Sequence, residues 1–346
     1  MWRTVDLPGR RVLGDLGGSS PLNDGDYSHA GVDWAGSDHS VRTLGAVTPS
    51  SPRDLPRRTV LFGMVTAAVA LGLGSCAGAR TDVLDATMAQ LVGGLDPNGL
   101  YRHPTGDEHR QALTGTDRLL RGDTAAAQQW FQPLGMDTSS AVDAATGRAY
   151  ALAASHPFTD RSWGLLVIDL TAPGPHLVLE VPHPVADQNS EHIGLALFRA
   201  IPGAALLVAG AHRRAADRTA DVAHQPESLF HAIATHLADI GLAQLQLHGY
   251  HDDSLPSHEI VISAGAGLPG PLAQQAADRL VARGFDVCRA WRRDCGDLEG
   301  RRNAQGRAAA EHGHPFVHLE INRSTRADPD RRATLIDALA VTYTPT

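Results

Sequence analysis

The chain has 346 residues, of which 42% are hydrophobic and 20% are charged, a composition typical of a globular protein with a well-buried core. All 30 basic residues are arginine, and the 38 acids leave a net charge of −8. Seven of the arginines and seven of the acids precede Cys76, so the whole net charge belongs to the rest of the chain. Nucleic-acid binding depends on neutralising phosphates, so we expect no nucleic-acid partner for a net-acidic domain.

Residues 57–76 have the pattern of an export signal. A pair of arginines precedes an uncharged stretch of sixteen residues, 59–74, which is short for a bilayer core that needs about 20. The segment ends in Leu-Gly-Ser-Cys76 and resembles the lipobox of bacterial lipoproteins, which implies a lipid on Cys76 and cleavage before it. The arginine pair resembles a twin-arginine signal, which implies export of the folded protein. We therefore expect an extracytoplasmic protein anchored to the cell membrane; the alternative is an ordinary membrane anchor with a chance cysteine.

The remaining chain divides into three further parts. Residues 1–56 are rich in Gly, Ser, Asp and Pro, and we interpret them as a disordered extension or the product of a start codon placed too far upstream. Residues 77–147 contain two helical patterns and are expected to form a helical preface. Residues 148–346 alternate short apolar runs with amphipathic helices and are expected to form an α/β domain.

The periodicity predicts helices and strands in alternation along the chain. Helices are expected over 82–92, 107–131, 190–200, 226–240, 271–283, 303–312 and 328–341, with Pro226 and Pro271 in first-turn positions. Strands are expected over 149–153, 164–170, 176–181, 204–209, 243–247, 259–263, 285–290 and 316–321. This alternation predicts a mostly parallel mixed sheet with helices on both faces, in which sites gather at the carboxyl ends of the strands.

Three polar side chains stand at predicted strand ends. His183 and His248 each follow a predicted strand, and Glu320 lies near the end of the last one. Imidazole and carboxylate are the ligand types of a catalytic zinc site, which keeps one position for water. The alternative for the two histidines is a hydrogen-bonded core position, and for Glu320 it is a buried salt bridge, for example with Arg323.

The loop after His183 offers a third ligand. Asp187 can bind the same ion from a turn, and Glu191 in the first turn of the next helix is the alternative ligand. Glu191 could equally do no more than favour the helix dipole. Ser190 is expected to cap that helix.

These segments resemble known zinc amidohydrolases. Pro-His183 followed by an acid and then by Ser-Glu191-His-Ile-Gly resembles the first metal motif of poly-γ-glutamate hydrolases, which have the wider metallocarboxypeptidase fold. The run Gln-Leu-His248-Gly is similar to the strand that supplies their last metal histidine. The ending Val-His-Leu-Glu320-Ile-Asn-Arg is similar to N-formylglutamate amidohydrolases, which share the fold.

The resemblance covers about 180–323 in separate pieces and implies roles for individual residues. It implies that His183, Asp187 and His248 are zinc ligands and that Glu320 is the carboxylate that activates the attacking water. This sequence departs from the family at Asp187, where a Glu is usual, which leaves the choice between Asp187 and Glu191 open.

Three loop residues are candidates for substrate binding. Arg213 follows the strand 204–209, and its planar fork suits a substrate carboxylate. His224 precedes a helix and is expected to contact substrate or an oxyanion, whereas Asp221 nearby is expected to cap the turn. Asn303 opens a helix whose free N–H groups favour anions. A solvated loop is the alternative for each of them.

Cys288 and Cys295 are close in the sequence of an exported domain, so they are either a local disulfide or two buried thiols. The sequence has no Gly-x-Ser-x-Gly elbow, which disfavours a serine nucleophile.

The sequence as a whole predicts an envelope-tethered, zinc-dependent hydrolase of amide or peptide bonds. Its substrate would be a peptide or amide that carries a free carboxylate, of cell-wall or extracellular origin. The alternative is a lipoprotein of the same fold that binds a metal or ligand without catalysis.

Overall fold

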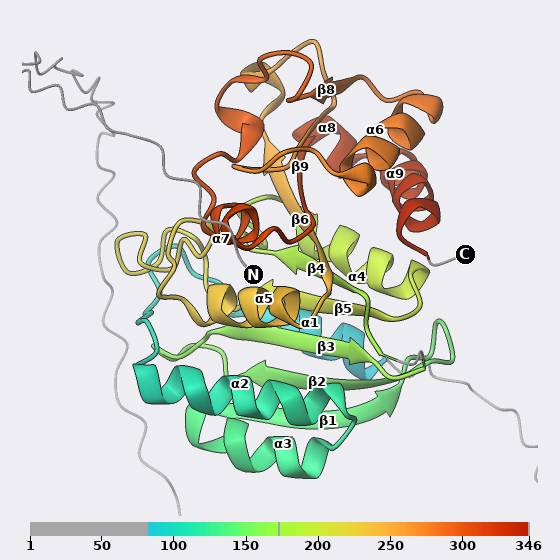
Figure 1. Cartoon of the computed structure of the whole chain (residues 1–346). Helices are drawn as coiled ribbons and strands as arrows, with labels where there is room; N and C mark the ends of the chain where they lie inside the picture. The colour runs from blue at the N-terminus through green and yellow to red at the C-terminus, as the bar shows by residue number, and fades with distance from the viewer. Residues whose placement is uncertain (1–81, 172–173, 345–346) are drawn as a thin grey trace, which may run out of the picture. The chain divides into compact units, whose positions relative to one another are not determined.

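The computed structural model describes residues 82–171 and 174–344, so the predicted signal and Cys76 lie outside the described residues. A single mixed sheet runs through this part of the molecule (Figure 1). Its strands are β1 (Met136–Val142), β2 (Ala149–Ser155), β3 (Gly164–Asp169), β4 (Leu177–Val181), β5 (Ala204–Ala209), β6 (Ala243–Tyr250), β7 (Ile260–Ser263), β8 (Val287–Arg289) and β9 (Phe316–Asn322). They lie in the order β1-β2-β3-β5-β4-β6-β9-β7-β8.

Parallel pairing is concentrated in the middle of this sheet. The four strands β5, β4, β6 and β9 are parallel to one another, and β7 pairs with β8 in the same way. Antiparallel pairing joins β1 to β2, β2 to β3, β3 to β5, and β7 to β9. The predicted α/β mixed sheet is confirmed, and the parallel strands are those whose carboxyl ends carry the candidate site residues.

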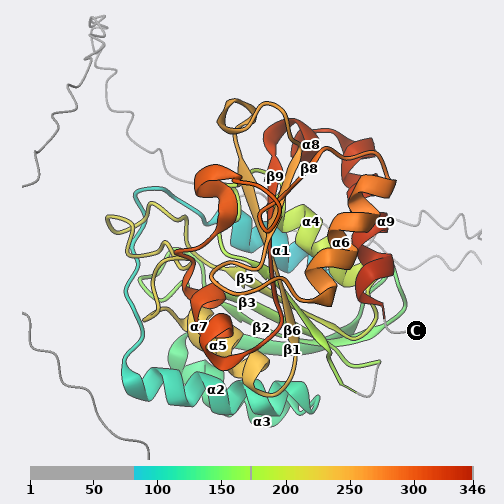
Figure 2. The same cartoon turned by 45° about the horizontal axis from the view of Figure 1, so that its top comes forward.

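Helices cover both faces of the sheet, as predicted (Figures 1 and 2). The helices of the described residues are α1 (Val83–Gly93), α2 (Gly106–Leu120), α3 (Thr124–Phe131), α4 (Ser190–Ala200), α5 (Leu229–Asp239), α6 (Pro271–Ala282), α7 (Ala304–His312), α8 (Arg323–Ala327) and α9 (Pro329–Tyr343). Short 3-10 turns occupy Gln132–Leu134, Asp252–Ser254 and Gly296–Glu299. The core on one face is built with α1, α4, α6 and α9, and the core on the other with α2, α3 and α5. None of these helices combines the length and apolar character needed to cross a membrane.

The segment 77–147 differs from the expected helical preface in two ways. It supplies strand β1, whose polar sequence Met-Asp-Thr-Ser-Ser-Ala-Val gives little apolar signal and whose pairing with β2 holds it in the sheet. The helix expected over 107–131 is two helices, because Gly122 turns the chain with φ +73 between α2 and α3.

One predicted helix start and one predicted helix cap are also wrong. Helix α5 begins at Leu229, and the Ser228 hydroxyl accepts from the His231 backbone N–H, so Pro226 stands before the helix. Ser190 is the first residue of α4, and the residue before it, Asn189, is the N-cap in the left-handed region with φ 67. Pro271 does open α6, as predicted.

The alternation of side chains in β6 and β9 places a polar patch on one face of the sheet. Leu245 and Leu247 in β6 face the core that contains α4 and α9, so Gln246 and His248 face the other way. The same alternation in β9 turns His318 and Glu320 to that other face. The register pairs Gln246 with His318 and His248 with Glu320, which places four polar side chains side by side.

Candidate metal centre and active site

The metal loop, residues 182–189, follows the buried end of β4 and holds its side chains in a tight turn. The Asp187 backbone N–H donates to the His183 carbonyl at 2.9 Å, which folds the loop back on itself. Val185 and Asn189 both have positive φ, 66° and 67°. A β-branched residue rarely adopts this conformation, and such strain is concentrated at functional sites. His183 and Asp187 are both buried.

The protonation of His248 follows from its neighbours. The Asn303 side-chain oxygen accepts from the Gly306 backbone N–H, so its amide nitrogen must be the group that donates to Gln246 Oε1. That oxygen also lies 2.7 Å from His248 Nε2. Since an amide oxygen only accepts, Nε2 carries the proton and Nδ1 of His248 presents a lone pair.

The protonation of His183 is fixed in the same way. Its Nε2 lies 2.7 Å from Asp221 Oδ1, and hydrogen bonds and charge hold the Asp221 carboxylate in place. Burial raises the pKa of Asp221, but hydrogen bonds from His183 and His224 and the charge of Arg213 outweigh burial and lower it overall. Asp221 is therefore an acceptor, His183 Nε2 is a donor, and Nδ1 of His183 presents its lone pair. The structure thus places Asp221 beneath His183, whereas the sequence predicted only a turn cap.

The free nitrogens of both histidines face one carboxylate. His183 Nδ1 lies 3.3 Å and His248 Nδ1 lies 3.5 Å from Oδ2 of Asp187. A tetrahedral zinc site with bonds of about 2.1 Å has ligand atoms roughly 3.4 Å apart. The three ligand atoms lie within 4.8 Å of one another, which makes these residues, here called the buried cluster, a group that could hold a metal ion.

Lone pairs that converge in a buried place require a cation among them, either a proton or a metal ion. Burial lowers the pKa of His183, but its interactions with Asp187 and Asp221 outweigh burial and raise it. Burial lowers the pKa of His248 to about 4. The outer nitrogen of each imidazole is bonded to an oxygen acceptor, which is the arrangement that orients metal-ligating histidines. The residues of the buried cluster fit a zinc-type ion.

Glu320 lies beside the buried cluster, and one of its carboxyl oxygens has no bonding partner among the described residues. Its Oε2 is buried and makes no hydrogen bond within the described residues. Burial raises the pKa of Glu320 well above its usual value, and the negative charge of Asp187 adds to the effect. A buried carboxyl without a partner is expensive, and a raised pKa suits a group that accepts a proton during a reaction. The alternative for Glu320, a salt bridge with Arg323, is not among the ion pairs of the described residues.

His318 belongs to the same site, although no sequence motif singled it out. Its ring lies 4.6 Å from the ring of His248, and its Nδ1 is buried and unbonded within the described residues. Burial lowers the pKa of His318 well below its usual value, so the ring is neutral. His248, His318 and Glu320 also have ligand atoms within 4.8 Å of one another. The alternation of β9 was the available signal, because it places His318 on the same face as Glu320.

A cavity of about 500 Å³ opens over these side chains. Its lining includes His183, His248, His318 and Glu320 on the floor. The walls are made largely of polar and charged residues, namely Arg213, Arg218, Asp221, His224, Gln225, Asp297, Gly300, Arg302 and Asn303. The lining therefore combines three arginines and two aspartates with the ionisable groups of the buried cluster, and the arginines can bind an acidic group of a ligand.

The predicted substrate-binding residues occupy different positions in this cavity. Nη2 of Arg213 lies 3.1 Å from Asp221 Oδ2, and Nη1 of Arg213 lies 4.0 Å from Asp187 Oδ1. His224 is half-exposed, with Nδ1 3.2 Å from Asp221. Asn303 is buried, and both of its side-chain polar atoms are already bonded, one as the N-cap of α7 and one to Gln246. Arg213 and His224 can therefore reach a ligand, whereas Asn303 holds the floor in place.

Glu191, the alternative to Asp187 as third metal ligand, makes different contacts from Asp187. Its Oε2 accepts from the backbone N–H of Val185 at 3.1 Å, and its Oε1 lies 3.7 Å from His192. It thus braces the metal loop at the strained Val185, while Asp187 supplies the oxygen that faces the histidines.

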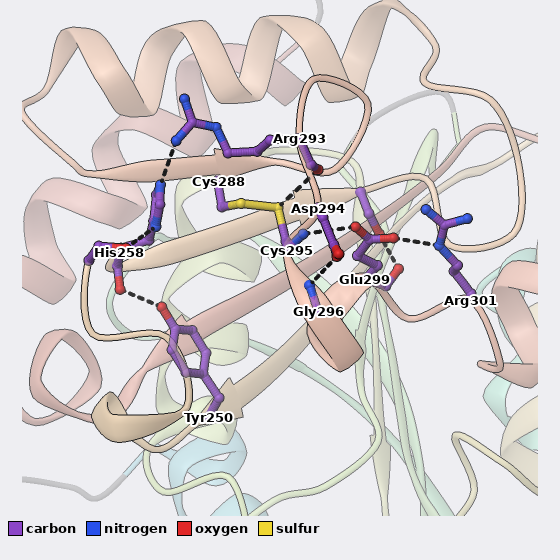
Figure 3. Close-up of a disulfide and its surroundings, with 11 residues drawn as sticks. Tyr250, His258, Cys288, Arg293, Asp294, Cys295, Gly296, Glu299 and Arg301 are labelled. Carbon is purple, nitrogen blue, oxygen red and sulfur yellow. Dashed lines mark hydrogen bonds and ion pairs between the residues drawn. A yellow bond between two sulfur atoms is a disulfide. The ribbon is translucent and has the colours of Figure 1, made fainter.

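One wall of the cavity is attached to a disulfide. Cys288 and Cys295 are bonded, with an S–S distance of 2.00 Å, and the Cys295 backbone N–H donates to Glu299 Oε1 at 2.9 Å (Figure 3). Gly300 comes next with φ +65, and a side chain there would meet the His318 ring, with a Cβ only 2.6 Å from its Cδ2. The disulfide-closed loop therefore leads directly to the contact that confines His318.

No family model and no curated protein matches the chain. Among solved structures, it is similar to zinc-free YndL, with 13% identity and a TM-score of 0.34 over 49% of this chain and 83% of that one. It is similar to a metallo-carboxypeptidase from Burkholderia cenocepacia, with 12% identity and a TM-score of 0.35 over 69% of each chain. An aspartoacylase-family protein from Mesorhizobium loti gives 11% identity and a TM-score of 0.34 over 59% of this chain and 67% of that one. Likenesses this distant do not decide function, which depends on the geometry of the site.

Proposed function

We propose that the chain is a zinc-dependent hydrolase of amide or peptide bonds in substrates that carry a free carboxylate. The observation that carries this proposal is the convergence of His183 Nδ1, His248 Nδ1 and Asp187 Oδ2, with each outer imidazole nitrogen already bonded. His183, Asp187 and His248 would hold the metal. When bound, zinc lowers the pKa of water and polarises a carbonyl oxygen.

The protein's own groups supply the proton transfers and the orientation. Glu320 takes a proton from the attacking water onto its carboxylate and gives it to the departing amine, so the two transfers leave the side chain unchanged. Because burial raises its pKa, Glu320 holds the transferred proton more readily than an exposed carboxylate would. Arg213 binds the carboxylate of the substrate with its planar fork, and its pairing with Asp221 sets the direction of that fork.

We also propose that the protein acts in the cell envelope, tethered by a lipid on Cys76. The support is the signal pattern of residues 57–76 in the sequence. Envelope amides with free carboxylates, such as peptidoglycan stem peptides and γ-glutamyl polymers, are the substrate class that this address and the arginine-lined cavity favour.

The test is a hydrolysis assay of the purified protein on N-acyl and γ-glutamyl amino acids and on stem peptides, each paired with its carboxamide analogue. We expect release of amine from the free carboxylates, little from the carboxamides, and loss of activity after treatment with a chelator. Zinc binding without hydrolysis of any of these compounds would instead support a metal-binding lipoprotein.

A further inference from the structure

Arg326 is a buried arginine that touches three segments of the site at once. It lies in α8 and is 4% exposed. Its Nε donates to the Ile321 carbonyl at 2.9 Å, its Nη1 to the Gln188 carbonyl at 2.6 Å, and its Nη2 to the Tyr250 carbonyl at 3.1 Å. One guanidinium therefore joins the ends of β9, the metal loop and β6.

Each of these carbonyls stands next to a residue of the proposed chemistry. Gln188 follows Asp187, Ile321 follows Glu320, and Tyr250 is two residues after His248. A buried carbonyl needs a donor, and the planar fork of arginine presents donors on three separate nitrogens, whereas the three donors of a lysine all stand on one nitrogen.

Two further contacts tie the same place together. The Asn189 side chain donates to the Arg326 carbonyl at 2.8 Å, so the end of the metal loop is bound to α8 in both directions. Gly249, which separates His248 from Tyr250, leaves the room that the guanidinium fills: a Cβ there would stand 2.3 Å from Arg326 Cζ. The Gly249 backbone N–H donates to Asp187 Oδ2 at 3.1 Å, which connects this contact to the ligand oxygen itself.

We propose that Arg326 is a positioning residue that sets the metal loop, the His248 strand end and the Glu320 strand end relative to one another. It is not among the residues that line the cavity, and it acts through the backbone of the three segments. The role in catalysis rests on the proposed function, whereas the joining of the three segments does not.

The first test is hydrogen–deuterium exchange, which needs no metal and no substrate. In Arg326→Lys we expect faster exchange in three separate segments together, 184–190, 247–251 and 320–323. Gly249→Ala should give the same pattern of exchange, because the added Cβ would collide with the Arg326 guanidinium. The control is Arg331→Lys, because Arg331 on α9 pairs with Glu259 and stacks on Phe285 without touching these segments.

The second test is zinc affinity by competition with a chromophoric chelator. We expect Arg326→Lys and Gly249→Ala to bind zinc about 10–100-fold more weakly, as for the loss of outer contacts of metal ligands, while Arg331→Lys keeps the affinity of the natural chain. Faster exchange confined to 323–327, or an equal loss of affinity in Arg331→Lys, would overturn the positioning role. If the natural chain binds no zinc, the proposed function fails, and the exchange pattern still decides whether Arg326 joins the three segments.

Discussion

The molecule contains a second group with the same residue types as the buried cluster. Asp239, His312 and His314, here called the exposed cluster, also have ligand atoms within 4.8 Å of one another. Both imidazoles face one oxygen of Asp239, His314 at 2.9 Å and His312 at 3.7 Å. By residue type and spacing alone, the two groups are equivalent candidates.

What surrounds each group separates them. The side chains of His183, Asp187 and His248 are at most 6% exposed, whereas Asp239 and His312 are about half exposed, at 52% and 47%. The outer nitrogens of the buried histidines are held by Asp221 and Gln246, and the exposed histidines make no such contact within the described residues. Water can satisfy the exposed cluster, whereas the buried one needs a cation, so outer contacts and burial identify a metal site better than ligand spacing does.

The largest effect is expected from replacing Glu320, which lies beside the buried cluster and not beside the exposed cluster. Glu320→Gln keeps the shape of the side chain but cannot take a proton, so we expect kcat to fall about 10²–10⁴-fold while zinc content is unchanged. The measurement is steady-state hydrolysis alongside metal analysis. Asp239→Asn at the exposed cluster is the matched control and should leave both values unchanged. Full activity in Glu320→Gln would remove Glu320 from the mechanism.

The next effect concerns the contact behind His183. Asp221→Asn can turn its amide nitrogen toward His183 and removes the charge that fixes the ring, so we expect zinc affinity to fall about 10–100-fold. Chelator competition measures the affinity, again beside Asp239→Asn. Equal affinities in Asp221→Asn and the natural chain would mean that outer contacts do not distinguish the two clusters.

The smallest effect concerns the buried chain of hydrogen bonds behind His248. Gln246 Nε2 donates to Glu180 at 2.8 Å, and burial raises the pKa of Glu180 to about 8. In the folded state the Glu180 carboxyl therefore stays protonated up to a pH near 8. In the unfolded chain the same carboxyl loses its proton near pH 4.5. The contribution of Glu180 to the free energy of unfolding is fully present below the pKa of the unfolded chain. It is lost as pH rises through the pKa of the folded state.

Glu180→Gln removes that titration, so the fall in Tm between pH 5 and pH 8 should be smaller than in the natural chain. A change of 1 kcal/mol corresponds to about 2–4 °C for a domain of this size. The difference is measured by thermal unfolding of both proteins without metal across this pH range. All other titrating groups are the same in the two proteins, so their effects on Tm cancel in the comparison. Parallel Tm curves for the two proteins would show that Glu180 does not carry the proton.

Much of the fold could be predicted because its strands are short apolar runs bounded by turn residues. Strand β5 and helix α4 have the predicted bounds, and His183 and Glu320 lie at the predicted strand ends. Strand β1 could not be predicted, since its polar residues reveal a strand only through pairing with β2.

The supporting residues of the site were harder to predict than its ligands. Asp221 reaches His183 across 38 residues, and Arg326 reaches Gln188 across 138. Such contacts depend on how loops close in three dimensions and leave no local pattern. Only His318 had a signal in the sequence, through the alternation of β9.

The most direct test of the metal site is the metal content of the purified protein, measured by elemental analysis in the natural chain, in His248→Ala and in His314→Ala. We predict one zinc per chain in the natural protein and in His314→Ala, and almost none in His248→Ala. A natural chain without stoichiometric metal, or one that loses its zinc through His314→Ala and keeps it through His248→Ala, would contradict the assignment of the buried cluster as the zinc site.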